Sequence, residues 1–103
     1  MFLTPDDFRK RIEFSLVPHF LSETEIKQKC RKAIDYEVGV ICINPNYVKT
    51  VKSLIGTKKI FLSANIGFPW GTHCTEFKAL EAKKAITEGA NQIDMVINVG
   101  ALR

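Results

Sequence analysis

The sequence of 103 residues has few cysteines, and none of them is placed for a cross-link or a metal site. Cys30, Cys42 and Cys74 form no Cys-x-x-Cys pair, and their odd number argues against a disulfide framework. The two histidines, His19 and His73, lack metal-ligand spacing. We therefore expect a protein of a reducing compartment, by default the cytoplasm, with no metal ion and no other cofactor.

Long apolar runs and blocks of like charge are also missing. The apolar stretches fall far short of the roughly 20 residues that a membrane-spanning helix needs, and the acidic start, residues 1–7, is unlike the basic region of a signal peptide. Fifteen Lys and Arg against eleven Asp and Glu give a net charge of +4, and these charges are scattered. We expect neither a membrane nor nucleic acid as partner, whereas a mild positive bias suits a phosphorylated substrate.

Four short apolar runs predict β-strands, and helix signals separate them. The runs are rich in β-branched residues or alternate apolar with polar residues, and they cover residues 12–16, 38–43, 60–66 and 92–99. Strands that alternate with helices of ten to sixteen residues are typical of βαβ units, so we expect a parallel sheet and an α/β fold. No repeat or linker marks a domain boundary within residues 1–103.

Capping residues mark where the helices begin and end. Ser22 and Glu25 form a capping box before an expected helix of about fourteen residues. Three further helices are expected. The first begins at Thr4 and Pro5 and ends near Arg11, the second begins at Asn44 and Pro45 and ends at Gly56, and the third begins at Thr72 or Thr75 and ends at Gly89. In the last of these helices, the side expected to pack on the sheet carries Phe77, Leu80, Ala85 and Ile86.

Each predicted strand has one apolar face and one face that holds its polar residues. The polar face collects Glu13, Ser15, Cys42, Asn44, Ser63, Asn65, Asp94 and Asn98. A sheet with helices on both faces needs two apolar faces. A (β/α)8 barrel instead turns one face inward, where polar side chains converge on a substrate. The pattern therefore favours a barrel-type sheet with a chemically equipped interior.

Asp94 is the strongest functional candidate on this face. An ionised carboxylate in the middle of a buried strand costs several kcal/mol unless it is paired, so a filler role would be expensive. For the other members a structural role competes. Cys42 is more often a small buried hydrophobe than a nucleophile. Ser63 and Asn65 are more often hydrogen-bonding filler than catalysts, and Glu13 can simply face solvent at a sheet end.

Several segments together resemble the 2-deoxyribose-5-phosphate aldolases, which are Schiff-base (class I) aldolases on the (β/α)8 barrel. The segments occur in the order and spacing of that family, and they are residues 40–48 (VICINPNYV), 65–71 (NIGFPWG), 75–82 (TEFKALEA) and 90–102 (ANQIDMVINVGAL). The similarity runs from about Ile12 to the last residue. It implies a TIM-type barrel truncated to about the first four strands and their helices.

The resemblance also implies a reaction and roles for residues. The family cleaves 2-deoxyribose 5-phosphate reversibly to glyceraldehyde 3-phosphate and acetaldehyde, through a lysine Schiff base and without a metal. Asp94 matches the family aspartate that works with a bound water in proton transfer, and Cys42 matches a cysteine that lines the substrate pocket. Glu13, Ser15 and Asn65 are expected to line the same pocket.

Two departures from the family leave two interpretations open. Where the family usually reads Ile-Asp-His-Thr-Leu-Leu-Lys, this chain has Ile12-Glu13-Phe14-Ser15-Leu16-Val17-Pro18, and Trp70 is bulkier than expected. The Schiff-base lysine and the lysine that lowers its pKa lie on the sixth and seventh strands of the family barrel, and none of the eleven lysines here matches them. The chain is then either part of an aldolase, inactive alone and completed by a carboxyl-terminal half or in a homo-oligomer, or a degenerate half-barrel that acts as a phosphate-binding or assembly module.

Overall fold

The computed structural model describes residues 2–103, which form one sheet of four parallel strands in the spatial order β1-β2-β3-β4. The strands are β1 (Glu13–Leu16), β2 (Val40–Ile43), β3 (Phe61–Ile66) and β4 (Gln92–Met95). Neighbouring strands pair in parallel, with Ser15 opposite Cys42 and Asn65 opposite Asp94. The predicted α/β fold with a parallel sheet is confirmed, although β1, β2 and β3 each begin one or two residues later than predicted.

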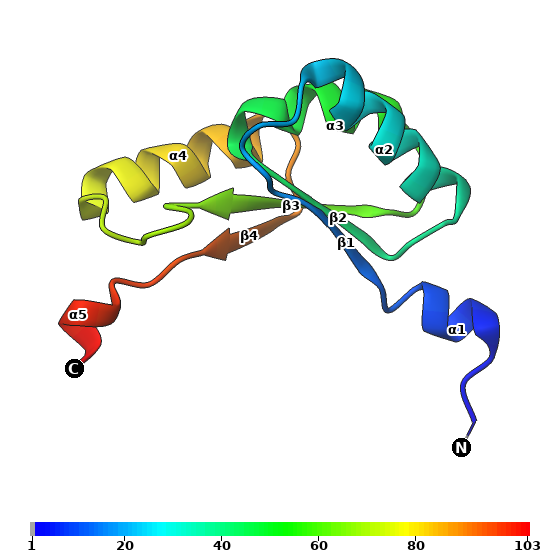
Figure 1. The fold of residues 1–103 in the computed structure, drawn as a ribbon, viewed down its shortest axis with the longest axis horizontal. Coiled ribbons are helices and arrows are strands. Elements are labelled where there is room, and N and C mark those ends of the chain that lie inside the picture. Colours follow the sequence, from blue (N-terminus) through cyan, green and yellow to red (C-terminus); the bar gives the residue numbers. More distant parts are fainter. Residues whose placement is uncertain (1) are drawn as a thin grey trace.

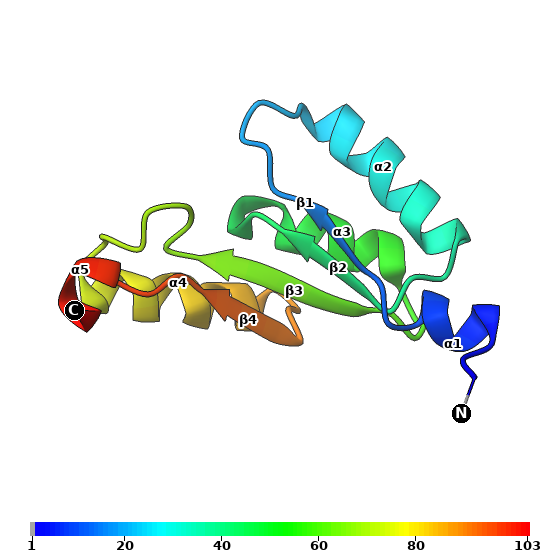
Figure 2. The same cartoon turned by 60° about the horizontal axis from the view of Figure 1, so that its bottom comes forward.

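Three long helices cover one face of this sheet. They are α2 (Glu23–Asp35), α3 (Val48–Ile55) and α4 (Thr75–Thr87), and all three lie on the same side of the strands (Figure 1). The shorter α1 (Pro5–Arg9) and α5 (Val99–Leu102) lie near opposite ends of the molecule (Figure 2). This one-sided cover is the arrangement of a barrel wall rather than of a doubly wound sheet.

The predicted capping residues agree with the structure in part. At α2, the Ser22 N–H donates to Glu25 Oε2 at 2.8 Å and the Glu25 N–H donates to Ser22 Oγ at 3.2 Å, so the capping box is confirmed. Gly56 ends α3 with a φ of +58°. The prediction for Asn44 is wrong, because its side chain makes no cap and donates instead to the Val17 carbonyl oxygen, while a 3₁₀ turn, η1 (Pro45–Tyr47), precedes α3.

The core lies between the sheet and α2 and α3. Ile41, Ile43, Leu62 and Ile66 point from the strands into this layer and are fully buried. The helices contribute the stripes that their periodicity predicts: Ile26, Cys30, Ala33 and Ile34 from α2, and Val48, Val51 and Ile55 from α3. Each buried Ile, Leu or Val stabilises the fold by about 1.5–3 kcal/mol relative to an exposed one.

Helix α4 does not pack as its sequence predicts. Phe77, Leu80 and Ile86 are 64%, 60% and 58% exposed, and only Ala85 of the expected packed side is buried. The reason is that α4 rests on β3 and β4 through small side chains, Ala85 and the partly buried Ala82. Its larger apolar side chains therefore remain largely exposed.

The last predicted strand is shorter than expected. β4 ends at Met95, and Asn98 then begins the short α5 by accepting a hydrogen bond from the Ala101 N–H at 3.3 Å. The prediction of a strand through Val99 is therefore wrong, because an Asn cap competes with strand pairing where β4 has a neighbour on one side only. Between Phe2 and Arg103, no helix is long and apolar enough to cross a membrane.

Candidate functional site

The helix-free face of the sheet gathers the candidate residues of all four strands. Glu13 and Ser15 come from β1, Cys42 from β2, Asn65 from β3 and Asp94 from β4. The parallel register places Ser15 beside Cys42 and Asn65 beside Asp94, so the polar side chains form neighbouring rows rather than separate sites. The face has a buried part and an exposed part, which differ in chemistry.

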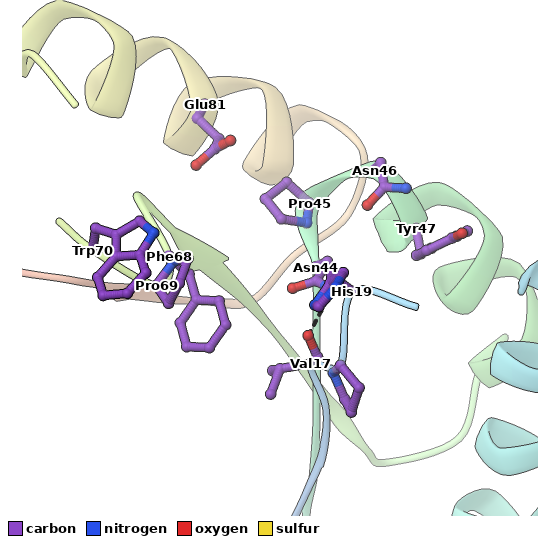
Figure 3. Close-up of a pocket in the computed structure, with 11 residues that line it drawn as sticks. Val17, His19, Asn44, Pro45, Asn46, Tyr47, Phe68, Pro69, Trp70 and Glu81 are labelled. Carbon is purple, nitrogen blue, oxygen red and sulfur yellow. Dashed lines mark hydrogen bonds between the residues drawn. The ribbon is translucent and has the colours of Figure 1, made fainter. Parts of the chain in front are cut away.

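A chain of hydrogen bonds runs through the buried part. The Cys42 thiol donates to Asn65 Oδ1 at 3.0 Å, and Asn65 Nδ2 donates to Asn44 Oδ1 at 3.3 Å. Asn44 Nδ2 then donates to the Val17 carbonyl oxygen at 3.1 Å, which is the dashed line of Figure 3. The Asn65 and Asn44 amides each accept one hydrogen bond and donate the next, so both amides have a fixed orientation and the ends of β1, β2 and β3 are linked.

The Cys42 thiol is a neutral donor. Burial, with smaller contributions from the carboxylates of Glu13 and Asp94 and an opposing one from the Ser63 hydroxyl, raises the pKa of this thiol to about 11. A thiol with this pKa is protonated at neutral pH and is a poor nucleophile. The structure thus gives Cys42 the role of a hydrogen-bonding wall residue, and it shows that the charges of Glu13 and Asp94 reach the same point of the face.

Asp94 is exposed, and the prediction of a buried carboxylate is wrong. The apolar residues around it in the sequence suggested a central strand, but β4 is an edge strand and its polar face has no covering layer within residues 2–103. Asp94 therefore has little desolvation cost here. Its functional candidacy now depends on its position beside Asn65 rather than on the expense of burying it.

Glu13 and Ser15 are exposed as well. The open side of the face thus carries two carboxylates and a hydroxyl, while the shielded side carries Cys42 and Asn65, which are 2% and 3% exposed. Carboxylates in contact with water can accept and return protons through that water, whereas the shielded thiol and amide can only orient a ligand. In the part of the chain that the structure describes, no three His, Cys, Asp or Glu residues come together as a metal site.

A pocket of about 740 Å³ lies at the carboxyl ends of β1, β2 and β3 (Figure 3). Sequence reasoning missed most of it, although loops that follow parallel strands are the usual place for ligand contacts. Its lining includes aromatic rings, amides and one carboxylate but no Lys or Arg: Val17, Pro18, His19, Asn44, Pro45, Asn46, Tyr47, Phe68, Pro69, Trp70 and Glu81. A second groove, of about 580 Å³, lies at the opposite ends of the strands and includes Lys10, Lys58 and Lys59.

Comparison with known proteins identifies relatives of the whole segment. No protein-family model matches the chain. The deoxyribose-phosphate aldolase of Natranaerobius thermophilus is 40% identical over 79 residues, covering 77% of this chain and 36% of that protein. Two further deoxyribose-phosphate aldolases match more of this chain. The one from Clostridium tetani is 36% identical over 94% of this chain and 45% of that protein. The one from Caldicellulosiruptor saccharolyticus is 35% identical over 97% of this chain and 46% of that protein.

Solved structures agree in fold. The tetrameric deoxyribose phosphate aldolase from Aeropyrum pernix has a TM-score of 0.87 and 28% sequence identity, over 95% of this chain and 42% of that one. Another aldolase has a TM-score of 0.87 at 35% identity, over 93% and 42%. The chain spans less than half the length of the curated relatives it matches. The resemblance seen in the sequence is confirmed: this chain is a four-stranded α/β relative of the deoxyribose-phosphate aldolases and corresponds to part of their TIM-type barrel.

Proposed function

We propose that these 103 residues form one part of an aldolase that cleaves 2-deoxyribose 5-phosphate reversibly to glyceraldehyde 3-phosphate and acetaldehyde. The observation that carries the proposal is the convergence of Cys42, Asn65 and Asp94 on one helix-free face, in a chain 35–40% identical to aldolases of that name. The cytoplasm is the proposed compartment, because the odd number of cysteines suits a reducing environment.

In this proposal Asp94 moves protons. A lysine amine attacks the aldehyde carbon, and loss of water from the resulting carbinolamine gives the Schiff base. The bond between the second and third carbons of the sugar then breaks: Asp94, through a water on the open face, accepts the proton of the hydroxyl on the third carbon, glyceraldehyde 3-phosphate leaves and the enamine remains. Asp94 returns the proton to the enamine carbon, and water hydrolyses the resulting Schiff base to acetaldehyde and the free amine. Glu13, Ser15, Cys42 and Asn65 face the substrate on the helix-free side of the sheet, next to the 740 Å³ pocket but not in its lining, and the neutral Cys42 thiol and the Asn65 amide hold the sugar rather than react with it. No metal takes part in this class I route.

The amine of this reaction comes from outside these 103 residues. In the described part of the chain all eleven lysines lie on helices or turns, and none lies on a strand of the polar face. Because no amine projects from that face, we propose that the chain alone does not turn over substrate. A polypeptide with the remaining strands and their lysines, or an assembly of several chains, would complete the site.

A non-catalytic function is the alternative, and one observation favours it. Lys58 and Lys59 line the groove at the amino ends of the strands, together with Glu37 and with Lys10, which pairs with Asp6, and a phosphate could bind at Lys58 and Lys59. The departures in β1, with Glu13 and Phe14 in place of the usual Asp and His, also fit a half-barrel that binds a sugar phosphate or serves assembly without catalysing a reaction.

One experiment separates these functions. The purified chain is mixed with the carboxyl-terminal portion of the Clostridium tetani enzyme that it does not cover, and acetaldehyde release from deoxyribose 5-phosphate is measured, with Asp94→Asn as the matched variant. The aldolase proposal predicts turnover in the mixture, at least 100-fold less with the variant, and none by the chain alone. Binding of deoxyribose 5-phosphate without turnover, by the chain alone and in both mixtures, supports the non-catalytic alternative. A borohydride-stable acetaldehyde adduct on a lysine of the chain alone contradicts the claim of catalytic incompleteness.

A further inference from the structure

The turn after β3, residues 67–71, is held by a side chain of α4. The Gly67 N–H donates to Glu81 Oε1 at 2.8 Å, and the Gly71 N–H donates to the Gly67 carbonyl oxygen at 2.8 Å. Gly67 has a φ of +67°, and a Cβ at this residue would lie 3.1 Å from Lys78 Cε. The stem of Lys78 therefore fills the space above the turn, three residues before Glu81 on the same side of the helix.

Lys78 then reaches the end of the neighbouring strand. Its Nζ donates to the Val96 carbonyl oxygen at 2.9 Å, and its side chain is half-buried. The Val96 N–H donates to the Ile66 carbonyl oxygen at 2.9 Å, which extends the pairing of β3 and β4 beyond Met95. On the other side Gly71 lies so close that a Cβ there would be 2.1 Å from the Ile97 carbonyl oxygen.

Residues 96 and 97 are thus held by three contacts from different segments, namely Ile66, Gly71 and Lys78. This held segment begins two residues after Asp94, and the turn held by Glu81 begins two residues after Asn65. One helix therefore fixes the ends of both strands that carry the paired residues Asn65 and Asp94. In a strand the place of a side chain follows from its backbone, so a shift at Val96 moves the Asp94 carboxylate.

We propose that Lys78 is a positioning residue, whose ammonium group, bound to the Val96 carbonyl oxygen, sets the place of the Asp94 carboxylate beside Asn65. Glu81, which accepts from the Gly67 N–H, fixes the end of β3 and so the place of Asn65. The importance of Asp94 rests on the proposed aldolase function, whereas the positioning itself does not. An ammonium that donates to a carbonyl keeps its proton, so Lys78 acts as a donor and not as the attacking amine.

The first test compares Lys78→Met, which keeps the stem but removes the donor, with Lys78→Arg, which keeps a cationic donor. Lys83→Met, at an exposed position of the same helix, is the matched control. Amide hydrogen exchange is measured by NMR. We expect Lys78→Met to speed exchange of the Val96 amide at least 10-fold, with little change in β1 and β2. With Lys78→Arg or with the control, the Val96 amide should exchange at the rate of the unchanged chain. An unchanged rate at Val96, or an equal increase throughout the sheet, overturns the proposal.

The second test asks whether Asp94 itself moves. Burial and the Glu13 charge raise the pKa of the Cys42 thiol most, and the Asp94 charge adds a smaller part. Alkylation of Cys42, followed against pH by peptide mass spectrometry, therefore reports on the Asp94 carboxylate when burial and Glu13 are left unchanged. Asp94→Asn should lower this apparent pKa, Lys78→Met should lower it too, and the double variant should match Asp94→Asn alone. A double variant that shifts by the sum of the single changes overturns the proposal. Both readouts use this chain without substrate, so they stand if the aldolase function fails.

If Lys78→Met does not fold, the unchanged chain still provides a test. Because the Lys78 ammonium is half-buried and hydrogen-bonded, acetic anhydride should modify it at least 10-fold more slowly than it modifies the exposed Lys83. Equal rates would mean that the bond to Val96 is not kept in solution, and the positioning role would be rejected.

Discussion

Single residues on the polar face act as a connected set. Hydrogen bonds join the Cys42 thiol, the Asn65 and Asn44 amides and the Val17 carbonyl oxygen. Cys42 and Asn65 are also nearly inaccessible to water. A buried polar group without a partner is costly, so the loss of one member affects the others. This connection explains how a strand face without a covering helix keeps buried polar groups.

Replacing Asn65 with Ala should therefore destabilise the chain by more than one lost bond. Both Cys42 and Asn44 lose a partner, and a buried unpaired group costs about 1–3 kcal/mol. We expect the free energy of unfolding, from urea denaturation, to fall by about 2–4 kcal/mol on this reasoning. Asn46→Ala, an exposed amide two residues beyond Asn44, should change it by less than about 0.5 kcal/mol. Similar losses for the two variants would contradict the hydrogen-bond chain.

The buried thiols should make stability decrease at alkaline pH. Burial raises the pKa values of the Cys30 and Cys42 thiols to about 11, from an ordinary value of 9.0. Above pH 9 the unfolded chain loses protons that the folded chain keeps, so stability is full below pH 9 and is lost as the pH rises toward 11. Urea midpoints measured from pH 7 to pH 10.5 check this, and Cys30→Ala with Cys42→Ala should flatten the alkaline decline.

Secondary-structure elements differ in how well the sequence predicts them. The capping box of α2, the parallel strands and the buried stripes of α2 and α3 follow from local rules that the chain obeys. The end of β4 does not follow from local rules, because an Asn such as Asn98 can lie in a strand or cap a helix, and its surroundings decide which. The side chains of α4 were also misassigned, since an apolar stripe shows that a helix has a packing side but not which neighbour it meets.

The same distinction applies to the site. Period-two alternation predicted which residues share the polar face. The register pairs Cys42 with Ser63 and Asn65 with Asp94, and the hydrogen bond from the Cys42 thiol to Asn65 joins the two pairs. Burial of Asp94 could not be read from its neighbours in the chain, because it depends on what lies across the sheet. Lys78 and Glu81 were missed for a related reason: their partners are backbone groups of loops, which leave no pattern in the sequence.

At the level of one helix, the capping box of α2 gives a simple test. Ser22→Ala removes the acceptor for the Glu25 N–H and should lower the free energy of unfolding by about 1 kcal/mol. Thr24→Ala, in the same exposed first turn, leaves the box intact and should change it by less than about 0.5 kcal/mol. Thermal or urea denaturation followed by circular dichroism measures both, and an equal loss would argue against the cap.

The whole molecule exposes surfaces that soluble monomers usually cover. β1 and β4 are the edges of the sheet, and exposed large apolar side chains occur on α4, at the end of β4, in the loop after it and on α5: Phe77, Leu80, Ile86, Met95, Ile97, Val99 and Leu102. Open edges offer unpaired backbone groups to another chain, and exposed apolar side chains favour association.

The isolated chain should therefore self-associate. Sedimentation velocity at increasing concentration should show a rising weight-average mass, and Leu80→Lys should reduce the rise by replacing one of these exposed apolar side chains with a charge. Lys83→Glu, on the same helix, is a control that leaves the exposed apolar side chains unchanged. A monomer with a sharp unfolding transition that does not depend on concentration would contradict this expectation.

The open polar face has a consequence for electrostatics. With water against Asp94 and Glu13, the field of these carboxylates is weakened by a solvent of high dielectric constant: two unit charges 4 Å apart interact by about 1 kcal/mol in water but by about 4 kcal/mol at an effective dielectric constant of 20. Any layer that displaces this water strengthens the influence of both carboxylates on Cys42 and on a bound ligand several-fold, without moving an atom of the sheet. The strength of the electric field at the site is thus set by what covers the face, and not by the four strands alone.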